Sequence, residues 1–319
     1  MHRLLYRIGG VFLNKNKLIT ANIGDDSISI MDIETPSNIT NVFLKELKYK
    51  NGSFIANLIR RKMGPLDLVA DENSNLIILN SYEESVISVD INNGYFEKIA
   101  NVGKNPVCIK IFNGNIYVLN CDSNSLSIIE EKTKELFEEI YLGEKPTDLQ
   151  IDKAENKLFI ANSNRNNITV LNLLDYSIEN IKLNSQPIRI IIGKEDIIVL
   201  SYLNNGVINF SELSIINKYS KKITSKSIKG IFIDIVKLGE DLFLLTNPED
   251  GYLYKFKNND LKKYIFLGGM PNKMVLDDER NYLYVTDLLN NYVLFIDLKK
   301  SIITNKIRVG KDPQAIILL

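Results

Sequence analysis

The chain has 319 residues, 45% of them hydrophobic, with 39 basic residues against 39 acidic ones and no net charge at pH 7. This is the composition of a globular protein, and the balanced charge gives no support to binding of nucleic acid or of an anionic membrane. Two cysteines are too few for a disulfide framework, and eighteen apolar residues never run together. We therefore expect a cytoplasmic protein without membrane insertion.

Short loops that end in proline recur along the chain with a nearly constant period. They end at Pro65, Pro106, Pro146, Pro187, Pro271 and Pro313. The spacings are 41, 40, 41, 84 and 42 residues, and the 84 is two periods whose middle loop ends at Gly230 instead of proline. Together with the loop at residues 8–10, they divide residues 1–319 into seven units of one domain.

Every unit also contains a short apolar strand that ends in Asn, Ser, Thr or Asp. These strands read LITAN (18–22), LIILN (76–80), IYVLN (116–120), LFIAN (158–162), IIVLS (197–201), LFLLT (242–246) and LYVTD (283–287). The polar residue at the end can hydrogen-bond to the backbone two residues on, which ends a strand in a turn.

About four short strands fit into each unit, with Gly, Asn and Asp between them, which predicts a small antiparallel sheet per unit. Many strands are apolar at consecutive positions, so both faces of each sheet must be buried. Seven sheets stacked in a ring satisfy this, and the sequence predicts an all-β, seven-bladed β-propeller with four-stranded blades. We expect the C-terminal strand, 314–319, to close the ring beside 18–22, with residues 11–13 as the alternative for that place.

The repeat resembles the YVTN type of β-propeller repeat found in bacterial proteins. The resemblance lies in LYVTDLLNNYVLFIDLKKSIITNKIRVGKDP (283–313) and LFIANSNRNNITVLNLLDYSIENIKLNSQP (158–187), which contain the G-x-x-P loop and strands similar to YVTN and VSVID. It implies the same propeller fold over nearly the whole chain. It does not select one function, because such propellers include binding modules, surface proteins and sugar-lactone hydrolases.

The innermost strands of a propeller line its central channel, so polar residues two and four positions after each loop should meet there. The candidates are Asp67, Lys110, Asp148, Gln150, Arg189, Asp234 and Lys273, with Asp234 counted as position four from Gly230. Their charges can neutralise one another across a wet channel. We expect no cofactor. Alternatively, Asp67, Asp148 and Asp234 can supply oxygen ligands to a divalent cation, although Arg189 and Lys273 count against it.

Unit one exceeds the others in length. The 55 residues from Gly10 to Pro65 are 14 more than the 41-residue period, which indicates an insertion at about 44–58. The segment 44–62 is basic, and its positive residues are Lys45, Lys48, Lys50, Arg60, Arg61 and Lys62. They are candidates for contact with a protein partner, because loops longer than the fold requires often serve recognition; a tolerated insertion is the alternative.

The sequence contains no familiar set of catalytic residues. His2 is the only histidine, and no P-loop, G-x-G-x-x-G or G-x-S-x-G motif occurs. Cys108 and Cys121 lie on neighbouring strands, either as buried apolar groups or as a redox pair. We expect a monomeric, non-catalytic module that binds a protein or a small molecule, and no nucleic acid. The alternative is a lactonase-like, metal-dependent hydrolase that uses the channel carboxylates.

Overall fold

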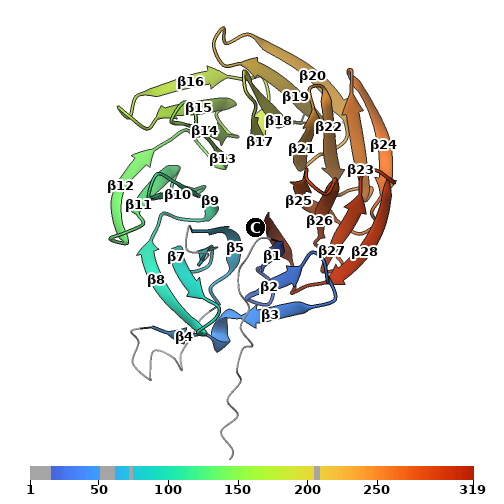
Figure 1. The fold of residues 1–319 in the computed structure, drawn as a ribbon. Coiled ribbons are helices and arrows are strands. Elements are labelled where there is room, and N and C mark those ends of the chain that lie inside the picture. The colour runs from blue at the N-terminus through green and yellow to red at the C-terminus, as the bar shows by residue number, and fades with distance from the viewer. Residues whose placement is uncertain (1–15, 51–61, 72–74, 205–208) are drawn as a thin grey trace, which may run out of the picture.

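The computed structural model describes residues 16–50, 62–71, 75–204 and 209–319. It confirms the predicted fold: seven antiparallel sheets, each with four blade strands, surround a central axis (Figure 1). Among the described residues the only helical segment is one short 3-10 turn, Leu44–Glu46, and none of their helices is long and apolar enough to cross a membrane.

The blades follow one another in chain order, and each has an innermost strand at the axis and three further strands outside it. From the axis outwards, blade 1 consists of β29 (Pro313–Leu318), β1 (Lys17–Asn22), β2 (Ser27–Asp32) and β3 (Ile39–Phe43). Blade 2 consists of β5 (Pro65–Ala70), β6 (Leu76–Asn80), β7 (Ser85–Asp90) and β8 (Tyr95–Asn101). Blade 3 consists of β9 (Pro106–Phe112), β10 (Asn115–Asn120), β11 (Ser125–Glu130) and β12 (Glu135–Tyr141).

The other four blades repeat this pattern. Blade 4 consists of β13 (Pro146–Asp152), β14 (Lys157–Asn162), β15 (Asn167–Asn172) and β16 (Ile178–Lys182). Blade 5 consists of β17 (Gln186–Ile192), β18 (Asp196–Asn204), β19 (Asn209–Asn217) and β20 (Ile223–Lys229). Blade 6 consists of β21 (Asp234–Gly239), β22 (Leu242–Asn247), β23 (Tyr252–Lys257) and β24 (Asp260–Phe266). Blade 7 consists of β25 (Pro271–Asp277), β26 (Tyr282–Asp287), β27 (Tyr292–Asp297) and β28 (Ile302–Arg308).

The two ends of the described chain meet in blade 1. Strand β29 pairs antiparallel with β1 in a register that runs from Leu18 opposite Leu318 to Ala21 opposite Ala315. The C-terminal strand therefore provides the inner wall of the blade whose other strands begin the chain. Residues 11–13, the alternative for this position, lie outside the described residues.

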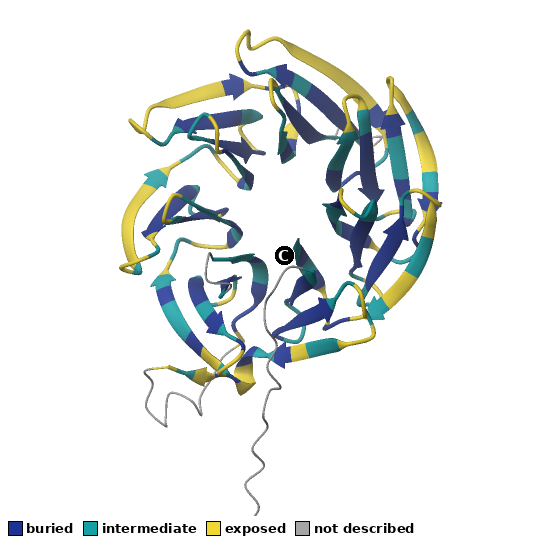
Figure 2. Ribbon diagram, viewed as in Figure 1, coloured by how far each residue is buried: buried dark blue, intermediate teal, exposed yellow. Residues whose placement is uncertain are grey.

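The apolar core lies between blades. Leu244 of blade 6, for example, belongs to the same buried cluster as Leu283 and Val285 of blade 7. Burial is greatest in the three inner strands of a blade and decreases at the outermost strand, which faces solvent (Figure 2). This arrangement explains why consecutive residues of a strand are apolar: each face of the sheet packs against a different neighbouring blade.

The polar residues at the strand ends stabilise the blade in a way the sequence did not indicate. Asn120 donates from Nδ2 to Ser125 Oγ at 3.1 Å and to Ser127 Oγ at 2.8 Å, so it joins the second strand to the third. The expected bond to the backbone two residues on occurs at Asp287, whose carboxylate accepts from Leu289 N. In blade 3 the loop glycine packs directly on Asn120, since a Cβ at Gly103 would lie 2.8 Å from Asn120 Cγ.

Part of the predicted insertion belongs to the sheet of blade 2. Strand β4 (Lys48–Tyr49) pairs in parallel with the outer strand β8 as a fifth strand. Leu44 and Leu47 are fully buried or nearly so, and the ring of Tyr49 meets that of Phe96 edge to face at 5.0 Å. The first part of the insertion thus covers the outer edge of blade 2, an edge that would otherwise expose unpaired backbone groups.

Candidate functional site

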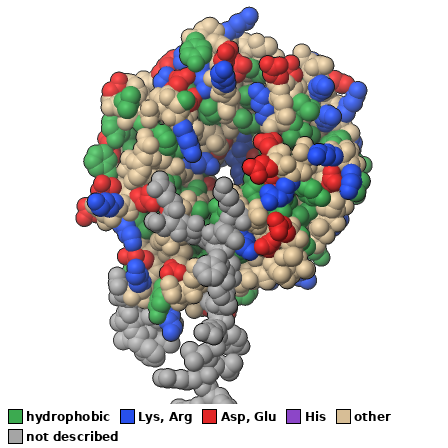
Figure 3. Space-filling model, viewed as in Figure 1, with side chains coloured by type: hydrophobic (Ala, Val, Ile, Leu, Met, Phe, Trp, Pro, Cys, Tyr) green, Lys and Arg blue, Asp and Glu red, His purple; other side chains and the backbone are tan. Residues whose placement is uncertain are grey.

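A cavity of about 680 Å³ lies on the axis of the propeller. Residues of all seven inner strands line it, and all seven channel candidates belong to its wall: Asp67, Lys110, Asp148, Gln150, Arg189, Asp234 and Lys273. In the space-filling view a central hollow opens between the blades, with basic side chains beside it (Figure 3). The structure therefore brings together in one place residues that are far apart in the sequence.

The three carboxylates each join one blade to the next. Asp67 Oδ2 accepts a hydrogen bond from Ile109 N at 3.0 Å, and Asp148 Oδ2 accepts one from Ile190 N at 2.7 Å. Asp234 Oδ2 accepts one from Met274 N at 2.7 Å. The three donors all lie on the third residue after a loop proline. We call these bonds the interblade staples; they connect blade 2 to 3, 4 to 5 and 6 to 7.

The place of Asp234 in the repeat differs from the predicted one. Counted from Gly230, Asp234 is at position four. Its bond to Met274 N, however, is equivalent to the bonds made by Asp67 and Asp148, which are at position two. In blade 6 the connection from Lys229 has four residues, as between Asn101 and Pro106, but it contains no proline, and the inner strand begins only at Asp234. The spacing from the loop therefore changes in this unit, although the contact is kept.

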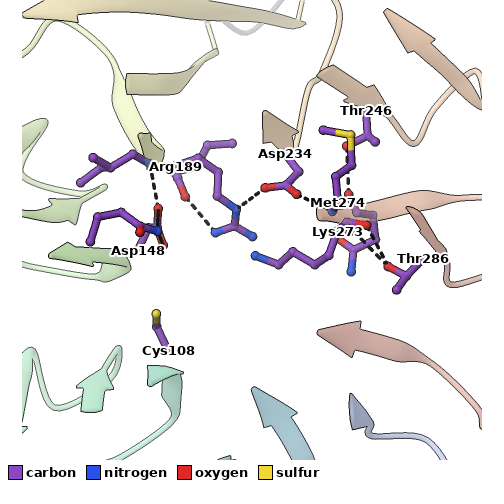
Figure 4. Close-up of polar contacts among 12 residues, drawn as sticks. Cys108, Asp148, Arg189, Asp234, Thr246, Lys273, Met274 and Thr286 are labelled. Carbon is purple, nitrogen blue, oxygen red and sulfur yellow. Dashed lines mark hydrogen bonds and ion pairs between the residues drawn. The ribbon is translucent and has the colours of Figure 1, made fainter. Parts of the chain in front are cut away.

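The basic groups differ from one another in their partners. Arg189 donates from Nε to Asp234 Oδ1 at 3.1 Å and from Nη1 to the carbonyl of Ile188 at 3.0 Å. Lys273 extends into the channel beside Arg189 (Figure 4). Within the described ranges, neither Lys273 nor Lys110 has a carboxylate within 4.0 Å of its ammonium group. Mutual neutralisation of the channel charges is thus direct only for Arg189 and Asp234.

The surroundings shift the pKa values of Lys273, Lys110 and Cys108 in the channel wall. Burial is the largest single influence on each. It lowers the pKa of Lys273, and the nearby Arg189 guanidinium lowers it further. Burial also acts to lower the pKa of Lys110, but the nearby Cys108, Asp67 and Asp148 groups outweigh it, so that this pKa lies above its ordinary value. The pKa of the Cys108 thiol is raised to about 12, mainly by burial, so this group is uncharged at neutral pH.

The three carboxylates of the predicted cation site already have donors of the protein. Both oxygens of each one already accept hydrogen bonds: Asp67 Oδ1 also accepts from Leu68 N, Asp148 accepts from Gln150 Nε2 at 3.3 Å, and Asp234 binds Arg189. A cation would have to share these oxygens with the donors, and its binding stays a prediction. In the described part of the chain, no three His, Cys, Asp or Glu side chains form a cluster that could hold a metal ion.

The wall of the cavity also contains residues that the sequence analysis did not assign to a ligand. Val69, Ile191 and Ile317 supply apolar surface at position four of blades 2, 5 and 1, where Lys110 and Gln150 stand in blades 3 and 4. Cys108 lies opposite Leu119 in the sheet, and both Cys108 and Cys121 are free and buried. Val69, Ile191 and Ile317 could have been found from the sequence, because they stand four residues after a loop proline, as Lys110 does.

Of the basic residues of the insertion, Lys48 lies on β4 and Lys50 directly follows it, at the outer edge of blade 2. Lys45, Lys48, Lys50 and Lys62 are exposed. The ammonium of Lys45 lies 5.5 Å from the ring centre of Phe43, and that of Lys50 lies 4.0 Å from Glu97. Arg60 and Arg61 lie outside the described residues. Contact of this surface with a partner stays a prediction.

The comparisons with known proteins agree with the fold. No protein-family model and no curated protein matches the chain. Among solved structures, a Lactobacillus plantarum protein gives a TM-score of 0.72 at 11% identity, covering 96% of this chain and 100% of the other. A candidate 6-phosphogluconolactonase from Bacteroides fragilis gives 0.69 at 12% identity, covering 98% and 100%.

A third similar structure comes from a different class of enzyme. Virginiamycin B lyase from Staphylococcus aureus gives a TM-score of 0.66 at 16% identity, covering 86% of this chain and 89% of the lyase. Identities this low show a shared architecture and no shared activity. By these comparisons the chain is similar to propellers of several functions, and it has the seven-bladed β-propeller fold.

Proposed function

We propose that this protein is a non-catalytic β-propeller that binds a small molecule in its central channel. The observation that carries the proposal is the cavity of about 680 Å³, whose wall combines apolar residues with a few convergent polar groups. Ligand pockets commonly have this size and this composition. The walls come from all seven inner strands, so the site is held by the whole ring and not by a single loop.

Binding without reaction is the interpretation that the channel chemistry favours. The uncharged Cys108 thiol is a poor nucleophile, and the three carboxylates already serve the fold through the interblade staples. A lactonase-like hydrolase would have to use one of these groups in addition to its bond within the protein. The similarity to a candidate lactonase is a similarity of fold, and we do not assign its activity to this chain.

The seven in-phase units also support, as part of this proposal, a relationship to YVTN-type repeat propellers. The loops ending in proline and the strands ending in a polar residue occupy equivalent places in the blades. In those places the loop glycine and the strand-end side chain touch, as at Gly143, where a Cβ would lie 2.9 Å from Asn162 Cγ. This contact explains why the loop glycine and the polar strand end recur together, and the explanation applies to any propeller with the same pattern.

A ligand screen tests the proposal. The purified protein is screened for thermal stabilisation by small molecules of all charge classes, in parallel with Ile191→Trp, which fills the channel, and Ile302→Trp, on the exposed outer strand of blade 7. A ligand at a hundred times its Kd should stabilise the wild type and Ile302→Trp by about 2.7 kcal/mol and leave Ile191→Trp unchanged. Stabilisation that survives in Ile191→Trp, or chemical conversion of the ligand, would contradict it.

A further inference from the structure

The channel wall contains three acidic and three basic groups. They differ in the partners that they have within the protein. Three carboxylates, Asp67, Asp148 and Asp234, have both oxygens engaged by donors of the protein. A guanidinium has five N–H donors, and the bonds of Arg189 to Asp234 and Ile188 use two of them. Each carboxylate is thus already held by donors of the protein, whereas Arg189 has N–H donors left over.

The two lysines add to this surplus. Among the described residues Lys110 and Lys273 have no ion pair, and both residues belong to the cavity wall. Figure 4 shows the Lys273 side chain reaching past Asp234 towards the Arg189 guanidinium, so two positive groups lie near one another. Placing like charges together in a partly buried wall costs free energy, which an anion between them would offset.

The remaining wall is of a different kind. Val69, Ile191 and Ile317 present apolar side chains at the level of the channel where Lys110 and Gln150 stand in blades 3 and 4. Cys108 is uncharged at neutral pH and does not add negative charge. A ligand that fills the cavity therefore meets positive donors on one part of the wall and hydrocarbon on another.

From this arrangement we infer that the channel ligand is a small organic anion with an apolar portion, whose negative group is bound by Lys273 and Arg189, with Lys110 as a further contact. The inference rests on the proposed function and specifies its ligand class. The anionic group accepts hydrogen bonds from the free N–H donors of Arg189 and from the ammonium of Lys273, as carboxylates and phosphates do in charge-assisted pairs. The apolar portion packs on the wall of blades 1 and 2, where Ile317 and Val69 lie.

Four naphthyl compounds of similar size but different charge test the inference. They are 1-naphthyl phosphate, 1-naphthoate, 1-naphthalenemethanol and 1-naphthalenemethylamine. Because the chain has no tryptophan, naphthyl fluorescence can be followed without overlap from indole. We expect the phosphate and the carboxylate to bind more tightly than the alcohol, and the amine to bind most weakly.

Variants identify the residues responsible. Lys273→Gln and Lys110→Gln remove one ammonium group each, and Lys226→Gln on the exposed outer strand β20 is the control. Lys273→Gln should bind naphthoate with a Kd about 10-fold to 100-fold higher than that of the wild type, because a hydrogen bond between two charged groups is lost. Binding of the alcohol should not change. The control should bind all four compounds as the wild type does, and circular dichroism checks that each variant is folded.

The outcomes separate the two proposals. Binding of the alcohol or the amine as tightly as the anions, with Ile191→Trp abolishing it, would overturn the anion inference and leave the ligand-binding function standing. Unchanged naphthoate affinity in both Lys273→Gln and Lys110→Gln would also overturn it. If none of the four compounds binds and no other compound stabilises the protein, the proposed function fails together with the inference.

Discussion

Asp67, Asp148 and Asp234 show how one side-chain type can serve the assembly of a repeat fold. Each reaches from the inner strand of its own blade to the backbone N–H of the next inner strand. A buried backbone donor at the edge of a sheet would be costly without a partner, and the carboxylate supplies one. Acidic residues in the channel therefore have a structural role that does not require a ligand.

Removal of a staple should destabilise the fold. Asp148 is 5% exposed, and Asp148→Ala leaves Ile190 N without its acceptor. We expect the free energy of unfolding, measured by urea titration, to fall by about 1–3 kcal/mol. Asp148→Asn keeps one acceptor oxygen and is the matched control, with a smaller loss. Equal stability of the alanine variant and the wild type would show that the staple contributes nothing.

Removal of the Lys273 ammonium group should have the opposite effect and stabilise the fold. Its pKa is lowered in the folded protein by burial and by Arg189, so the unfolded chain holds this proton more tightly. The resulting cost is fully present below the folded-state pKa and disappears as pH rises towards 10.5, the ordinary pKa of a lysine. Lys273→Met should therefore raise the free energy of unfolding at pH 7 by about 1 kcal/mol, the ordinary size of a single-residue effect.

The measurement is urea unfolding of the wild type and Lys273→Met at several pH values from 7 upwards. The difference between the two proteins should shrink as the wild-type lysine loses its proton. A difference that grows with pH would mean that the charged form of Lys273 stabilises the fold. Gain of stability together with loss of anion binding is the signature of a charge kept for a ligand.

At the scale of the strand and the blade, the feature with the largest consequence is the pairing of β29 with β1. Two buried alanines, Ala21 and Ala315, face each other across this pair. Replacing both with cysteine should allow a disulfide that fixes the ring shut. Because the closed loop contains most of the chain, oxidation should stabilise the protein by up to about 5 kcal/mol.

The same double variant under reducing conditions is the control for this prediction, and the single variant Ala21→Cys checks for disturbance of the core. Urea midpoints before and after reduction give the difference. Identical midpoints in both states would contradict the predicted stabilisation.

The sequence predicted the blades better than it predicted their contacts. Recurrence of proline loops and polar strand ends was enough for seven blades, because each unit forms its sheet from local hairpins. The staples were missed because they join units, and Asp234 was misplaced because unit six has no proline from which to count. The channel residues themselves followed from position alone, yet which of them were free to bind a ligand depended on hydrogen bonds that a repeat pattern does not contain.

At the scale of the whole molecule, closure of the ring means that every blade packs against two others. In an open stack of repeats the end units are less stable and can unfold separately. We expect the closed ring to unfold in one transition, with the same urea midpoint by tyrosine fluorescence and by far-ultraviolet circular dichroism. Two different midpoints would show that some blades unfold independently of the rest.

The pairing of β29 with β1 also has a consequence for synthesis of the protein. While the chain emerges from the ribosome, six blades can assemble, but blade 1 lacks its inner strand until Leu318 has been made. One wall of the central cavity is then missing as well, since residues 314–317 belong to it. A nascent or prematurely ended chain therefore has an open edge and an incomplete binding site, and its ability to hold a ligand is acquired last.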